Sequence, residues 1–147
     1  MTSTTKGPWL RLLAAVAVLA VALAACSQAK ASPTAKASIH LRNFHIDLLG
    51  ALRPGPTTFD ISSAGPTMHE LNIARTVFQS DKLPLAADGT VDDTEPHAGF
   101  DHLAEAEGID IGDHASLTVD LTPGHYVLYC NMEGHYMAGM HTDFTVL

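Results

Sequence analysis

Lys, Arg and Cys are scarce in this chain of 147 residues. The shortage of cations argues against a nucleic-acid partner, and the small number of cysteines bears on whether a disulfide forms. Lys and Arg together number 8, against 16 Asp and Glu. A protein with so few cations binds phosphate backbones poorly, so we expect no nucleic-acid partner. The chain has only two cysteines, Cys26 and Cys130. Because each has a separate predicted role, described below, we expect no disulfide.

Long apolar runs are also missing. The longest, Leu12 to Ala25, has 14 residues, fewer than the ~20 that a permanent membrane-spanning helix needs. Lys6 and Arg11 lie at or before its start, and a basic segment followed by a short apolar run is typical of an export signal. We therefore predict that residues 1–25 are a signal peptide and not part of the fold.

The apolar run ends in Leu23-Ala24-Ala25-Cys26, which resembles the lipobox of bacterial lipoproteins. The resemblance implies that residues 1–25 are removed and that Cys26 is lipidated, which would anchor the protein at the outer face of the cell membrane or in the periplasm. The alternative is a secreted protein in which Cys26 is incidental, and that protein would still be exported. Residues 26–38 are small and polar, which predicts a flexible tether. Residues 39–147 then form one domain.

The exported chain is strongly acidic. Without Lys6 and Arg11, six Lys and Arg face sixteen Asp and Glu, a formal charge of −10. Such a surface can steer basic partners toward the protein. Solubility alone would explain it equally well, so both interpretations stay open.

Short alternating segments with Gly and Pro turns predict an all-β fold. Residues 57–62 alternate Phe59 and Ile61 with polar side chains, and residues 116–121 repeat the pattern. The stretch 39–48 predicts one strand with a bulge near Asn43 and Phe44. In 126–130, Tyr126, Leu128 and Cys130 share one face. Strands at this spacing are typical of a β-sandwich with Greek-key connections.

Residues 76–113 interrupt the pattern, since they are rich in Asp, Glu, Gly and Ala. We interpret them as an excursion between two strands. Within them, 95–108 has the composition of one short helix ended by Gly108. His97 and His102 lie among acids here and could form a second metal site, although their spacing does not favour one.

The C-terminal part contains three candidate metal ligands within eleven residues. Cys130, His135 and Met140 follow one another directly after an alternating segment. A thiolate, an imidazole and a thioether at this spacing favour copper, because soft sulfur suits Cu(I) and imidazole suits Cu(II). A further histidine must complete the set, and His69 is the obvious candidate. We predict one copper ion held by these four residues.

This stretch resembles the type 1 (blue) copper signature of the cupredoxins. The resemblance rests on Tyr126-Val127-Leu128-Tyr129-Cys130, on Gly134-His135 and Gly139-Met140, and upstream on 55–61, Gly65 and His69. It implies a Greek-key cupredoxin β-sandwich over residues 39–147. The loop length is similar to that of auracyanin-like and rusticyanin-like proteins and longer than that of plastocyanins.

One residue departs from the family pattern. Many cupredoxins have Asn after the first histidine ligand, where it braces the cysteine loop, but here that residue is Glu70. Asn131, next to Cys130, could donate a hydrogen bond within the loop or be an ordinary turn residue. Both are candidates for contacts that tune the metal.

The resemblance implies a one-electron carrier, a monomer that exchanges electrons with membrane-associated redox proteins. The alternative is a copper-binding or copper-delivery protein that uses the same site, or the surplus His and Met residues that include Met68, Met132 and Met137. An enzyme is not expected. The chain has no His-x-His pair for further coppers, and residues 131–139 contain no second cysteine for a binuclear centre.

Overall fold

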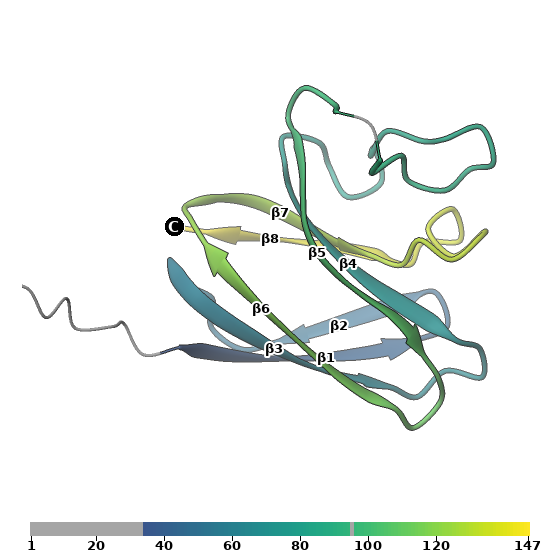
Figure 1. Cartoon of the computed structure of the whole chain (residues 1–147), viewed down its shortest axis with the longest axis horizontal. Coiled ribbons are helices and arrows are strands. Elements are labelled where there is room, and N and C mark those ends of the chain that lie inside the picture. Colours follow the sequence, from purple (N-terminus) through teal and green to yellow (C-terminus); the bar gives the residue numbers. More distant parts are fainter. Residues whose placement is uncertain (1–33, 95) are drawn as a thin grey trace, which may run out of the picture. The chain divides into compact units, whose positions relative to one another are not determined.

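The computed structural model of this protein describes residues 34–94 and 96–147, which form two four-stranded β-sheets packed face to face (Figure 1). One sheet has the strand order β2-β1-β3-β6 and the other β5-β4-β7-β8. The strands are β1 (Ala35–Arg42), β2 (His45–Leu49), β3 (Gly55–Ser63), β4 (His69–Thr76), β5 (Phe100–Ile109), β6 (His114–Leu121), β7 (Gly124–Tyr129) and β8 (His141–Val146). The predicted all-β sandwich is confirmed.

The signal peptide and Cys26 lie outside the described residues. Within residues 34–94 and 96–147, no helix has the length and apolar character needed to cross a membrane. β1 begins at Ala35, so residues 35–38, which we predicted as the end of the tether, already belong to a strand. They pair in parallel with β3, and this pairing between distant segments left no local sequence signal.

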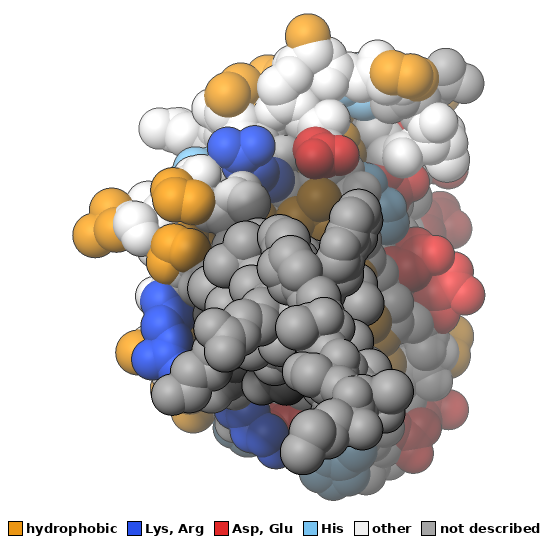
Figure 2. Space-filling model, turned by 60° about the vertical axis from the view of Figure 1, so that its left-hand side comes forward, with side chains coloured by type: hydrophobic (Ala, Val, Ile, Leu, Met, Phe, Trp, Pro, Cys, Tyr) orange, Lys and Arg blue, Asp and Glu red, His pale blue; other side chains and the backbone are white. Residues whose placement is uncertain are grey.

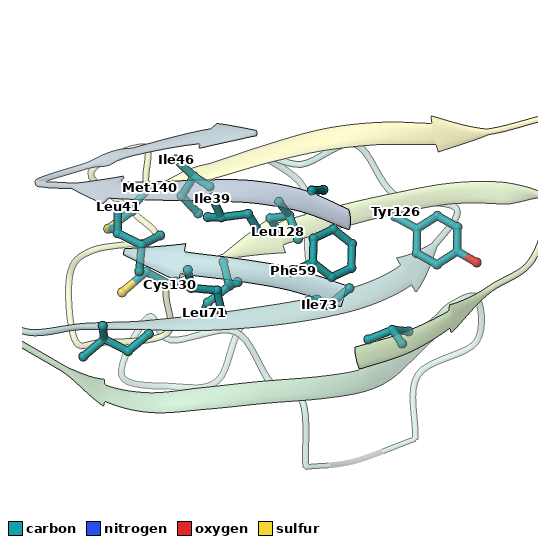
Figure 3. Close-up of a cluster of buried hydrophobic side chains, with 14 of the residues drawn as sticks. Ile39, Leu41, Ile46, Phe59, Leu71, Ile73, Tyr126, Leu128, Cys130 and Met140 are labelled. Carbon is teal, nitrogen blue, oxygen red and sulfur yellow. The ribbon is translucent and has the colours of Figure 1, made fainter. Parts of the chain in front are cut away.

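The main core lies between the two sheets and follows the predicted alternation. Phe59 and Ile61 of β3 and Leu121 of β6 are at most 1% exposed, while Thr58 and Asp60 face outward or partly outward. Because side chains alternate along a strand, each of these segments buries one face. Figure 3 shows this cluster, with Tyr126 at one end and Cys130 and Met140 at the other.

β7 is buried on both faces. Tyr126 and Leu128, with Cys130 just after the strand, belong to the main core, as the sequence predicts. Val127 and Tyr129 point the other way, into a second apolar cluster that also contains Leu83 and Tyr136. The loop between β4 and β5 therefore covers the part of this sheet's outer face around Val127 and Tyr129.

The helix predicted within residues 95–108 is wrong. Residues 100–109 form β5, which pairs antiparallel with β4. Pairing along a neighbouring strand outweighs local helix propensity, which contributes only tenths of a kcal/mol per residue. Gly108, predicted as a helix end, has φ +63° and lies where the register shifts between His69 and Leu71, as in a β-bulge.

The single bulged strand predicted for 39–48 is also wrong. β1 and β2 form a hairpin in which Arg42 pairs with His45, so Asn43 and Phe44 make the turn. Phe44 has φ +59°, a conformation that reverses the chain but is rare for a bulky residue. A Gly at this position would have indicated a hairpin; Phe gave no such signal.

Candidate metal centre

Three elements bring the four predicted ligands to one end of the sandwich. His69 is the first residue of β4, Cys130 follows β7 directly, and Met140 directly precedes β8. His135 lies in the loop between the last two. Figure 3 shows the sulfur atoms of Cys130 and Met140 at the same end of the core. His69, Cys130 and Met140 are fully buried, and only His135 is partly exposed.

The donor atoms converge on one point. One donor atom from each of His69, Cys130 and His135 lies within 4.8 Å of the others. His135 Nδ1 is 3.4 Å from His69 Nδ1 and 3.3 Å from Cys130 Sγ. Two ring nitrogens facing each other repel unless a proton or a cation lies between them. The arrangement is a His-Cys-His-Met cluster compatible with a type 1 copper ion.

Burial acts in opposite ways on the histidine and on the cysteine of this cluster. Burial, together with the charge of His135, lowers the pKa of His69, which favours the neutral imidazole that ligates metals. Burial raises the pKa of the Cys130 thiol, and the backbone N–H groups of Glu70 and Met132 lower it in part. A metal that binds the thiolate must therefore displace a proton. His69 Nε2 is buried and has no hydrogen-bond partner among the described residues.

Backbone contacts fix the ligand positions. Cys130 N–H donates to the Met140 carbonyl at 3.1 Å, which closes the base of the ligand loop, residues 130–140. Met140 N–H donates to the His135 carbonyl at 3.0 Å. On the β4 side, a β-carbon on Gly65 would collide with Nε2 of His69. Only glycine leaves room there for the imidazole.

Glu70, which stands where many cupredoxins have Asn, contacts the cysteine through its backbone but not through its side chain. Its backbone N–H points at Cys130 Sγ, 3.5 Å away. Its side chain instead accepts a hydrogen bond from the Asn72 amide at 3.0 Å, and Asn72 in turn contacts His102 Nε2 at 2.9 Å. The contact to the thiolate thus comes from the backbone, which any residue at this position can provide.

Asn131 makes its contacts outside the ligand loop. Its side-chain oxygen accepts from Val91 N–H at 2.6 Å, and its amide donates to the Val91 carbonyl at 3.0 Å and to Asp93 at 3.1 Å. Sequence reasoning missed this role and did not single out Tyr136, whose hydroxyl binds the same segment. A tyrosine directly after a ligand histidine was the available signal.

The possible second metal site does not form. His97 lies 3.2 Å from Asp92, whereas His102 on β5 contacts Asn72 on β4. In the part of the chain that the structure describes, His69, Cys130 and His135 are the one group of three ligating side chains close enough to share an ion.

Comparison with known proteins places the fold. No protein family matches the sequence, and no curated protein matches it either. Solved structures do match. Auracyanin from Roseiflexus castenholzii is 18% identical, with a TM-score of 0.57 over 79% of this chain and 99% of its own. Auracyanin B is 18% identical, with a TM-score of 0.58 over 79% of this chain and 91% of its own. Rusticyanin from Thiobacillus ferrooxidans is 18% identical, with a TM-score of 0.52 over 79% of each chain.

These proteins are cupredoxins. The chain therefore has the cupredoxin fold, and at the end where its predicted ligands meet it carries a His-Cys-His-Met cluster typical of a type 1 copper site.

Proposed function

We propose that this protein binds one copper ion and carries single electrons. The observation that carries the proposal is the convergence of His69, Cys130 and His135 donors within 4.8 Å at one end of a cupredoxin fold. Bound copper would supply a one-electron couple, Cu(I)/Cu(II). The residues hold both states because the sulfur donors suit Cu(I) and the imidazoles suit Cu(II). Met140 completes the set from the start of β8.

Burial favours electron transfer over copper delivery. His69, Cys130 and Met140 have no exposed surface, so a metal held by them exchanges slowly with solvent. Electrons need no such access, because they reach the surface through the ring of His135. The aromatic ring of Phe44, 46% exposed, packs edge-on against His135 with centroids 5.6 Å apart. No step in this scheme needs a substrate pocket, so the enzyme interpretation gains no support.

Exposed apolar side chains lie on the segments that carry or contact the candidate ligands. Phe44, Met68 and Met137 lie on three such segments and are 46%, 39% and 63% exposed. Met132, considered with them from sequence, packs against the main core instead. We propose that this apolar rim contacts a membrane-associated redox partner. Figure 2 turns the left-hand side of Figure 1 forward, so the ligand loop, drawn in yellow at the right of Figure 1, lies away from the viewer. On the face shown, Asp and Glu gather on the right-hand side and Lys and Arg toward the left. Because the chain carries 16 Asp and Glu against 8 Lys and Arg, we expect binding of the partner to depend on salt.

Copper titration of residues 27–147 tests the site. We expect Cu(II) to give an intense blue absorption and a narrow hyperfine splitting in the electron paramagnetic resonance spectrum, because the thiolate is a ligand. Cys130→Ser should lose both. Met137→Leu, at an exposed methionine of the same loop, is the matched control and should keep both, whereas Met140→Leu should shift the midpoint potential.

A weak tetragonal Cu(II) signal that survives Cys130→Ser would overturn the proposal. Surface histidines would then hold the metal, and the copper-binding or copper-delivery interpretation would replace electron transfer.

We propose further that the chain is exported and anchored through lipidated Cys26, as a monomer. Support for export and anchoring comes from the lipobox-like Leu23-Ala24-Ala25-Cys26. In a bacterial host, the wild-type protein should fractionate with membranes and carry an acyl mass on its first residue. Cys26→Ser should release the protein from the membrane, and equal membrane retention of both forms would contradict lipid anchoring.

A further inference from the structure

The ligand loop is tied to the loop between β4 and β5 by two side chains, one on each side of His135. Asn131 makes three hydrogen bonds to Val91 and Asp93, between 2.6 and 3.1 Å. All three cross from the ligand loop to residues 91–93. Because they use both the oxygen and the amide of Asn131, they fix the side chain in one orientation and set its distance from the neighbouring segment.

Tyr136 makes the second connection. Its hydroxyl donates to the Ser80 carbonyl at 2.9 Å and accepts from Leu83 N–H at 3.0 Å. The side chain is 4% exposed, and its ring contacts Tyr129 and His141, with centroids 6.4 and 5.1 Å away. A buried hydroxyl with both partners satisfied resists displacement, since losing either leaves a polar group unpaired.

The segment that receives these bonds, residues 77–94, has structure of its own. Asp92 N–H donates to the Pro84 carbonyl at 2.9 Å, and Ala86 N–H donates to Thr90 O at 2.9 Å. Leu83 and Val91, 5% and 2% exposed, point from it into the second apolar cluster. Figure 1 shows the segment as the teal and green excursion beyond the ends of β4 and β5. It is a folded support for the ligand loop.

We propose that residues 77–94 clamp the ligand loop, with Asn131 and Tyr136 as positioning residues, so that the loop keeps its ligand geometry without the metal. This proposal rests on the copper site proposed above. A rigid loop holds His135 and Met140 in one arrangement for both oxidation states. A looser loop lets the ligands follow the geometry that Cu(II) prefers, so it should lower the midpoint potential.

Tyr136→Phe tests the clamp, because it removes one hydroxyl and keeps the ring. In the metal-free protein, we expect the amides of His135, Gly139 and Met140 to exchange with solvent about tenfold faster, since two hydrogen bonds of ordinary net strength are lost. Asn131→Ala removes the other connection and should act in the same direction. It also provides a test if Tyr136→Phe folds poorly.

The chain offers a matched control in Tyr126→Phe. The Tyr126 hydroxyl also donates to a carbonyl and accepts from a backbone N–H, both of Thr122, at 2.8 and 2.9 Å. Tyr126 is 1% exposed and lies at the end of the core away from Cys130 and Met140 (Figure 3). Its loss should reduce global stability to a similar extent and leave exchange in the ligand loop unchanged.

Two readouts separate the outcomes. Faster loop exchange in Tyr136→Phe than in Tyr126→Phe supports the clamp, and equal exchange in the two variants overturns it, whether or not copper binds. In the copper-loaded protein, Tyr136→Phe should lower the midpoint potential and broaden the hyperfine pattern, while Tyr126→Phe should change neither. If copper does not bind at all, the function proposed above fails, and the metal-free exchange still decides the clamp.

Discussion

The molecule has two apolar cores that differ in origin. The main core lies between the sheets and contains sixteen buried residues, all but Cys130 and Met140 contributed by strands. The second core, which is the second apolar cluster described above, contains seven buried residues. It joins the outer face of one sheet to the 77–94 segment and to Tyr136 of the ligand loop. The main core is thus built from regular alternation, whereas the second depends on irregular segments.

The two cores therefore affect different parts of the candidate site. The main core fixes β4, β7 and β8 and therefore the positions of His69, Cys130 and Met140. The second core acts on the loop between the last two of these ligands. Changes in the main core should lower the stability of the whole domain, while changes in the second should act first on the ligand loop.

Phe59→Ala should have the largest effect. Phe59 has no exposed surface and lies in the middle of the main core. Removing a buried aromatic ring leaves a cavity and costs about 3–5 kcal/mol, a large part of the 5–15 kcal/mol that ordinarily holds a domain folded. Urea unfolding should show a much lower free energy of unfolding, with amide exchange faster in both sheets.

Phe44→Ala is the control for Phe59, because Phe44 is 46% exposed. We expect its free energy of unfolding to stay within about 1 kcal/mol of the wild type. Similar losses in the two variants would mean that burial does not decide how much each of these two rings contributes to stability.

Leu83→Ala should have an intermediate effect that concentrates in the ligand loop. Leu83 is 5% exposed in the second core. We expect a loss of about 2 kcal/mol, the lower end for buried leucine, since a loop segment can move to fill the space. Hydrogen exchange should accelerate more in residues 131–140 than in β1 and β3. The control is Leu85→Ala, two residues away and 44% exposed, and exchange that rises uniformly would argue against a separate second core.

The sequence predicted the main core well because its information is local. Phe59, Ile61 and Leu121 alternate with polar residues, and one buried face is enough to produce that pattern. The candidate ligands could be picked out from the sequence for a related reason. Cys130, His135 and Met140 lie within eleven residues, and the metal chemistry of those side chains is specific.

The second core could not be predicted, because it depends on contacts between distant segments. Nothing local indicates that Asn131 meets Val91, or that Tyr136 meets Ser80 and Leu83. The errors have the same cause. Residues 100–109 have the composition of a helix, but pairing with β4 makes them a strand. The Asn43–Phe44 turn lacks glycine because packing against His135 supports Phe44 in an unusual backbone conformation.

Lys82→Ala should have the smallest effect on stability. It compares an exposed residue with the buried Leu83 within the same 77–94 segment. Lys82 is adjacent to Leu83, but its ammonium group pairs with Asp81 at 2.8 Å on the surface, where both side chains are more than half exposed. Exposed ion pairs contribute little, because water and salt screen them. We expect no measurable change in the urea midpoint or in exchange of the ligand loop. A clear loss in either would show that the charges of the 77–94 segment, and not only its buried leucine, hold it against the ligand loop.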